Sequence, residues 1–96
     1  MPSKRSLPAA LKMARKARGL SQEAFSDVSS RTYLSTLERG MKSPTLSKLA
    51  AISQVLSIHP LTLLMLSYTG GQPAEVESLI ARIRREITTL SHTSSS

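Results

Sequence analysis

Four hydrogen-bonding side chains lie close together near the middle of the chain, at Arg31, Thr32, Ser35 and Thr36. Leu34 and Leu37 stand three residues apart within this stretch, a spacing that places both on one face of a helix. The polar side chains then point away from the core. A guanidinium group and three hydroxyls bind by hydrogen bonds, so recognition of a polar partner is the chemistry to expect here.

The chain offers little for catalysis or metal binding. It contains no cysteine, which excludes a disulfide framework, a thiolate metal site and a cysteine nucleophile. His59 and His92 have no ligand or nucleophile partner in the sequence, and His59 is better placed as a helix cap before Pro60. Paired carboxylates and a glycine-rich phosphate loop are also missing from the sequence. We therefore expect no enzyme activity, no metal and no cofactor.

The positive charge is concentrated at one end of the chain. The formal net charge is +7, and residues 1–20 contain no acidic residue but several basic ones: Lys4, Arg5, Lys12, Arg15, Lys16 and Arg18. Such an excess suggests a polyanionic partner, either nucleic acid or an anionic membrane face. The basic helix lacks the aromatic anchors of a membrane binder, and the longest apolar run is too short to span a bilayer. We expect a soluble, cytoplasmic protein.

Helical periodicity runs through the whole sequence, whereas alternation of period two is nearly missing, so we expect an all-α fold. The expected helices cover residues 7–18, 22–28, 31–39, 46–56, 61–68 and 74–91, with caps at Ser6, Ser21 and Thr45. We expect two buried faces, one made by Leu7, Leu11, Ala14 and Ala17, the other by Leu46, Leu49, Ala50, Ile52 and Leu56. Residues 1–69 form one domain, 70–91 a linker and a further helix, and 92–96 a disordered tail.

The stretch from Leu7 to Leu66 resembles the helix-turn-helix domain of the Xre family, the group that includes Cro and the lambdoid phage repressors. The resemblance rests on Arg15, on residues 19–23 (GLSQE) and 37–40 (LERG), on the turn at 43–45 (SPT), and on 56–58 (LSI). It implies a five-helix lambda-repressor-like domain, followed here by a C-terminal sixth helix. In such domains the recognition helix lies in the major groove of DNA.

The resemblance also implies roles for single residues. Base-reading positions fall at Arg31, Thr32, Ser35 and Thr36, and phosphate contacts at Gln22, Tyr33, Arg39, Lys42 and Ser43. Tyr33 has a second interpretation, in which its ring packs over Leu37. Arg15 and Glu38 match positions that form a salt bridge under the recognition helix. The partner implied is double-stranded DNA.

The turn before the recognition helix departs from the family pattern. Residues 26–30 (SDVSS) are shorter than usual and contain no glycine, which makes a left-handed turn residue costly. We expect either a shortened second helix or a turn in which Ser29 and Ser30 act as polar caps.

The last helix carries an apolar seam with the spacing of a coiled coil, at Val76, Ile80, Ile83, Ile87 and Leu90. Leu79 widens this seam, and the preceding helix is apolar nearly all round, including Leu63 and Leu66. These eight residues are the expected interface of a homodimer. The alternative is that the seam packs onto the core of its own subunit.

These features together predict a sequence-specific DNA-binding transcriptional regulator of bacterial or phage type. The most specific form of this hypothesis is a repressor that binds a pseudo-palindromic operator as a homodimer. The alternative is the antitoxin of a toxin–antitoxin pair, in which the last helix binds a partner protein instead of a second copy.

Overall fold

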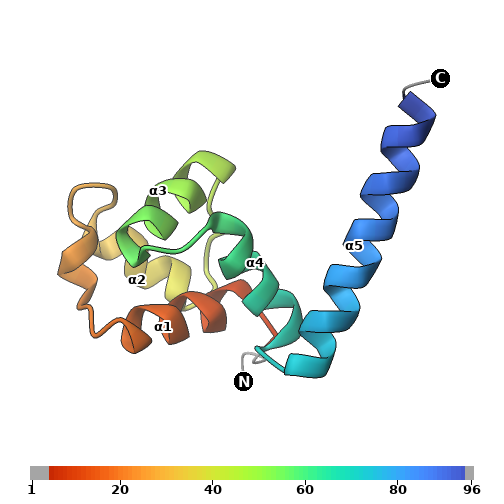
Figure 1. The fold of residues 1–96 in the computed structure, drawn as a ribbon. Helices are drawn as coiled ribbons and strands as arrows, with labels where there is room; N and C mark the ends of the chain where they lie inside the picture. The colour runs from red at the N-terminus through yellow and green to blue at the C-terminus, as the bar shows by residue number, and fades with distance from the viewer. Residues whose placement is uncertain (1–4, 95–96) are drawn as a thin grey trace.

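The computed structural model describes residues 5–94 and contains only helices and the loops between them in that range, which confirms the expected all-α fold (Figure 1). Its elements are α1 (Leu7–Ala17), the 3₁₀ helix η1 (Gln22–Phe25), α2 (Arg31–Glu38), α3 (Leu46–Leu56), α4 (Pro60–Thr69) and α5 (Pro73–Ser94). The first five elements form a compact body, from which α5 projects (Figure 1).

Polar side chains set the starts of α1, α3 and α4. The Ser6 hydroxyl accepts a hydrogen bond from the Ala9 amide at the start of α1, and Thr45 does the same at the start of α3. His59 Nδ1 accepts from the Leu61 amide before Pro60, which confirms its expected role as a cap. Ser21 forms no side-chain cap hydrogen bond at η1, in contrast to the expectation.

The core lies where α1, α2, α3 and α4 meet. Its fully buried large side chains are Phe25, Leu34, Ile52, Leu56 and Leu63. Leu63 was expected on a dimer interface, and this expectation is wrong, because its side chain is 0 % exposed inside its own subunit. Leu66, expected at the same interface, is half-buried and packs against this core.

The expectations for the buried faces of α1 and α3 are also partly wrong. On α1, Ala10 is buried where Ala17 was expected, since Ala17 lies in the last turn and is exposed. On α3, Leu46 is 82 % exposed at the first helical position, and Ala50 is exposed as well. The buried face of α3 therefore runs through Leu49, Ile52, Ser53 and Leu56.

The second helix is much shorter than expected, a single 3₁₀ turn that ends at Phe25 instead of residue 28. Ser30 then caps α2, because its hydroxyl accepts a hydrogen bond of 3.0 Å from the Tyr33 amide. Ser29 is buried, and its hydroxyl donates to the Ser30 carbonyl. The two structural solutions expected for a turn without glycine thus occur together.

Helix α5 contacts α4 near its start and then extends away from the body (Figure 1). Val76, Leu79 and Ile80 are half-buried, whereas residues 81–92 are exposed. The helix continues to Ser94, so residues 92–94, expected in a disordered tail, are helical. The rest of that tail, Ser95 and Ser96, lies outside the described residues.

Within residues 5–94, no helix on its own combines the length and apolar character needed to cross a membrane. Helices α3 and α4 reach these thresholds only when taken together, and they meet at an angle of 97°.

Candidate nucleic-acid interface

Helix α2 presents a polar face to solvent and an apolar face to the core. Leu34 and Leu37 are 0 % and 2 % exposed and anchor the inner face. On the outer face, Arg31 and Thr32 are exposed, and Ser35 and Thr36 are half-exposed one turn later. The structure therefore brings the four candidate base-reading residues together on one accessible surface of about two helical turns.

A buried ion pair fixes how α2 lies against α1. Arg15 Nε donates to Glu38 Oε2 at 2.6 Å, and Arg15 Nη2 donates to Glu38 Oε1 at 3.0 Å. The side chains are only 13 % and 5 % exposed. This is the salt bridge that the resemblance implies.

The same guanidinium also ties down the chain that leads into η1, because Arg15 Nη1 donates to the Leu20 carbonyl at 2.9 Å. The hydrogen bonds to Glu38 raise the pKa of Arg15, burial opposes that rise, and the negative charge of Glu38 adds to it. Arg15 therefore remains positively charged beneath α2.

Gln22 joins this cluster from the start of η1. Its side-chain amide Nε2 donates to Glu38 Oε1 at 3.3 Å, and the residue is half-buried. Glu38 thus receives hydrogen bonds from both α1 and η1. The contact holds the Gln22 side chain beside the end of α2, and its expected contact with a DNA phosphate stays a prediction.

Arg31 is held loosely in the free protein. Its Nη1 lies 3.3 Å from Glu23 Oε1, and both side chains are 73 % exposed. An ion pair this exposed contributes little free energy, so a stronger acceptor can displace Glu23 with little loss of stability. The guanidinium is therefore available to a partner that approaches the outer face of α2.

The two threonines on α2 are linked to each other. The Thr36 hydroxyl donates to the Thr32 carbonyl at 2.7 Å, one turn earlier in the helix. Because its hydrogen is used, the Thr36 oxygen is left as an acceptor, and its methyl group remains available for apolar contact. Such a group suits an amino group or a thymine methyl on a base edge.

The expected phosphate contacts flank α2. Arg39 is exposed at the end of the helix and donates to the Ser35 carbonyl at 3.4 Å, and Lys42 and Ser43 are exposed in the loop that follows. Gly40 begins this loop with a φ of +74°, a left-handed conformation that glycine adopts without strain. Tyr33 is half-buried and packs against the core, and its expected contact with the DNA backbone stays a prediction.

Two basic side chains have positions that the sequence reasoning missed. Lys48 Nζ donates to the Val28 carbonyl at 2.6 Å and lies 5.5 Å from the centre of the Tyr33 ring, so it closes the turn in front of α2. Arg18 donates to the carbonyls of Leu56 and Ser57, at the end of α3. A signal for Lys48 was present, because a cation in the first turn of a helix opposes the helix dipole and needs a compensating partner.

These contacts change the meaning of the basic N-terminal stretch. Arg5 pairs with Glu75, Arg15 pairs with Glu38, and Arg18 binds the end of α3. Lys12 and Lys16 are exposed on α1, and Lys4 lies outside the described residues. Three of the cations in this stretch therefore make contacts within the fold, and only that of Arg15 is largely buried.

A comparison with protein families matches residues 11–63 to the family described as Helix-turn-helix. The match covers more than half of the 96 residues, from the first half of α1 into α4. The chain belongs to the helix-turn-helix family. Comparisons with curated proteins and with solved structures give no match. The membership supports a DNA-binding regulator, and α5 lies beyond the matched residues.

Proposed function

We propose that this helix-turn-helix protein is an Xre-type transcriptional repressor that binds a specific, pseudo-palindromic operator as a homodimer. The observation that carries the proposal is the outer face of α2. It gathers exposed Arg31 and Thr32 with half-exposed Ser35 and Thr36, on a helix whose inner leucines and terminal Glu38 are fixed in the body. An accessible, rigidly held polar helix is what reading the major groove requires.

Base reading would fall chiefly to Arg31. It stands at the first position of α2, the end of a recognition helix that meets the base edges, and its only ion-pair partner among the described residues is the exposed Glu23. A guanidinium can bind guanine O6 and N7 with two hydrogen bonds, which is worth ~1–3 kcal/mol of discrimination. Thr32, Ser35 and Thr36 would add hydroxyl or methyl contacts along the same face.

Contacts to the DNA backbone would position α2 in the groove. Arg39, Lys42 and Ser43 lie on the exposed segment directly after α2, and Gln22 lies at the start of η1 beside Glu38. Contacts of this kind fix orientation and register without reading sequence. Tyr33 would contribute through its exposed edge, while its ring remains packed against the core.

Exposed apolar side chains on α4 and α5 support the homodimer. Leu61 is 65 % exposed, Ile87 is 59 % and Leu90 is 68 %. Burial of such a surface between two copies would place two α2 helices about one DNA turn apart, ~34 Å, on one face of the duplex. A dimer that occupies two successive major grooves excludes other proteins from that DNA, and for this reason we propose repression.

Selection of binding sites from random duplex DNA tests the proposal. The wild-type protein should enrich an inverted repeat whose half-sites are ~10 base pairs apart, centre to centre. The same selection with Arg31→Ala should lose the preference at one symmetric pair of positions and keep the others. Failure of the wild type to enrich any sequence would contradict sequence-specific binding.

A further inference from the structure

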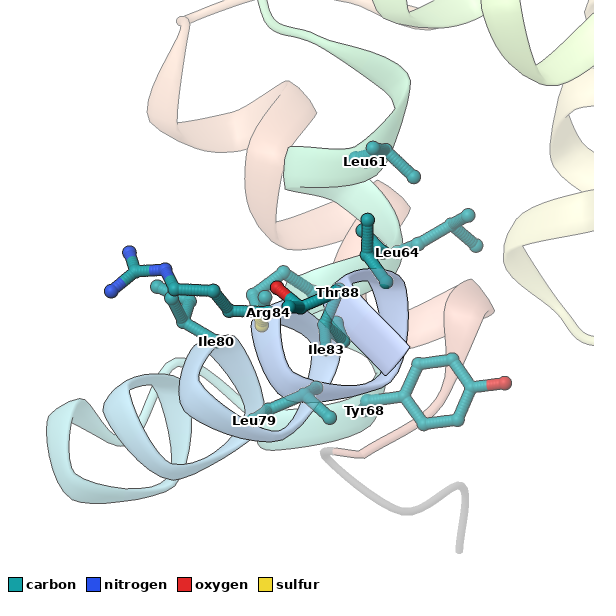
Figure 2. Close-up of a pocket in the computed structure, with 10 residues that line it drawn as sticks. Leu61, Leu64, Tyr68, Leu79, Ile80, Ile83, Arg84 and Thr88 are labelled. Atoms are coloured by element: carbon teal, nitrogen blue, oxygen red, sulfur yellow. The ribbon is translucent and has the colours of Figure 1, made fainter. Parts of the chain in front are cut away.

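An apolar groove of about 600 Å³ runs between α4 and α5, and of its lining residues Leu61 alone falls within the residues matched to the helix-turn-helix family. Its walls include Leu61, Leu64 and Tyr68 from α4 and Leu79, Ile83 and Ile87 from α5. Figure 2 shows Arg84 at the rim of the groove, with its guanidinium directed away from Tyr68. The polar face of α2 does not contribute to this groove.

The groove is the start of a longer unpacked surface. Along α5, Ile83 is 39 % exposed, Ile87 is 59 % and Leu90 is 68 %, so exposure grows as the helix leaves α4. These residues continue the heptad spacing that begins at Val76 and Ile80. The d positions of this coiled-coil repeat are Val76, Ile83 and Leu90, and the a positions are Ile80 and Ile87. The helix therefore carries a complete seam, of which α4 of the same chain covers only the beginning.

Two opposite charges flank this seam and have no ion-pair partner among the described residues. Glu23, Glu38, Glu75 and Glu86 each form an ion pair, whereas Glu77 forms none with any residue that the structure describes. Within residues 5–94, Arg84 also has no ion pair. Glu77 and Arg84 are seven residues apart and each directly follows a seam residue, so they lie along the same edge of α5. Two helical turns separate them, too far for a pair within one helix.

We propose that the groove receives α5 of a second copy of this chain, paired antiparallel, so that Glu77 of each copy lies opposite the partner's Arg84. In an antiparallel helix pair the residues that follow d positions on the two helices face one another. An alignment that sets Glu77 against Arg84 also sets Val76 against the partner's Ile87, and Ile80 against the partner's Ile83. One register therefore satisfies the seam and both unpaired charges, twice by symmetry.

The parallel arrangement lacks this complementarity. In a parallel pair, each residue that precedes an a position faces a residue that follows a d position on the partner. Leu79 would then face the partner's Arg84, and Glu86 would face the partner's Ser91, so neither Glu77 nor Arg84 would gain an opposite charge. The charge pattern thus selects a second copy in the antiparallel direction.

Antiparallel pairing also covers the part of α5 that is exposed in one copy. Because α4 packs near the start of α5, the partner's α4 would arrive beside the far half, where Ile87 and Leu90 are exposed. The two helix-turn-helix bodies would lie at opposite ends of the helix pair. The inference deepens the proposed homodimer and rests on it. The paired α5 helices would then set the distance between the two copies of α2.

Charge reversal tests the pairing. Glu77→Arg and Arg84→Glu should each weaken the dimer about tenfold at low salt, because each turns two attractions into two repulsions. The double variant, and an equimolar mixture of the two single variants, should recover wild-type dimer affinity by analytical ultracentrifugation. The single-variant defects should shrink at high salt. Arg85→Glu, on the outer side of α5, is the matched control and should leave dimer affinity unchanged.

Cysteine pairs test the direction, since the natural chain has none to interfere. A mixture of Val76→Cys and Ile87→Cys chains should form a mixed disulfide on oxidation, and Val76→Cys alone should not. A disulfide between two Val76→Cys chains would show a parallel pair and overturn the proposal, as would single reversals that leave dimer affinity unchanged. A wild-type monomer would overturn it too, while sequence-specific DNA binding that depends on Arg31 would leave the base-reading proposal intact.

Discussion

Arg15 on α1 and Glu38 at the end of α2 form the most buried ion pair in the described part of the chain. Two hydrogen bonds of 2.6 and 3.0 Å join them, and Arg15 also binds the Leu20 carbonyl. Because Glu38 is the last residue of α2, the pair fixes the end of the helix opposite to Arg31. The leucines determine which face of α2 is buried, and the ion pair helps to determine where the helix points.

Replacement of Glu38 by glutamine should destabilise the fold. Glu38→Gln keeps the shape but leaves Arg15 charged and largely buried, so the free energy of unfolding should fall by about 2–3 kcal/mol, somewhat less than for a fully buried pair. Urea denaturation measures this loss. The control is Glu86→Gln, which removes an exposed pair with Arg82 and should change stability by less than ~0.5 kcal/mol. Equal losses in the two variants would show that burial of the Arg15 pair adds nothing.

The raised pKa of Arg15 determines where its contribution to stability depends on pH. A basic group whose pKa is raised by folding stabilises the protein below its unfolded pKa and loses that contribution as pH rises through the folded value. For an arginine this window lies in strongly alkaline solution. The guanidinium itself should therefore add no pH dependence around neutrality.

Replacement of Arg31 by alanine should separate specific from non-specific binding. Arg31→Ala should lose ~1–3 kcal/mol of binding free energy at the selected operator and change binding to random DNA little. Fluorescence anisotropy on both DNAs measures the difference. Glu23→Gln removes the acidic partner of Arg31 and should preserve the preferred sequence. Equal losses on operator and random DNA would reassign Arg31 to a phosphate contact.

Lys42 should contribute through charge alone. Lys42→Ala should weaken binding to every sequence, and the slope of log affinity against log salt should fall by about one unit, because one fewer phosphate is neutralised. Arg85→Ala is the control, since Arg85 is on the outer side of α5, away from α2. An unchanged slope for Lys42→Ala would rule this residue out as a contact.

Lys48 should matter for the turn before α2. Lys48→Met removes a charged hydrogen bond to the Val28 carbonyl and a cation over the Tyr33 ring, so unfolding free energy should fall by about 1–2 kcal/mol. Operator binding should fall more than binding to random DNA, because a looser turn shifts α2. Lys16→Met, at an exposed site on α1, should be nearly neutral in both measurements. A neutral Lys48→Met would show that Ser29 and Ser30 alone hold the turn.

The all-helical fold, the starts of most helices and the Arg15–Glu38 pair were predictable from sequence. These features depend on local rules or on the family resemblance: Ser6, Thr45 and His59 cap helices whose first residues follow directly. The position of the polar face of α2 also followed from the spacing of Leu34 and Leu37. Short-range spacing was sufficient for the helix starts and the polar face, whereas the Arg15–Glu38 pair, 23 residues apart in the chain, followed from the family resemblance.

Burial by distant elements was harder to predict. Leu46 and Leu63 are both leucines on apolar helices, yet one is 82 % exposed and the other 0 %. Periodicity gives the composition of a face but not the element that covers it. The roles of Arg18 and Lys48 have the same origin, since each binds carbonyls that are 20 or more residues away in the chain.

The seam on α5 should be necessary for the dimer and dispensable for the fold. Ile83 and Ile87 are 39 % and 59 % exposed, so Ile83→Glu combined with Ile87→Glu removes apolar surface that no part of the same body buries completely. The double variant should be a folded monomer by light scattering and circular dichroism. Ser78→Glu with Ala81→Glu adds the same charge on the outer side of α5 and should remain dimeric.

Operator binding by the Ile83→Glu, Ile87→Glu monomer connects assembly to function. It should match the wild type on a single half-site, because α2 is unchanged, and bind the full operator far more weakly, because the second half-site no longer benefits from linkage. Anisotropy on whole and half operators gives both values. A wild type that is monomeric at micromolar concentration and stays monomeric on operator DNA would contradict the homodimer. In that case α5 would be free to bind a different protein through the same apolar seam.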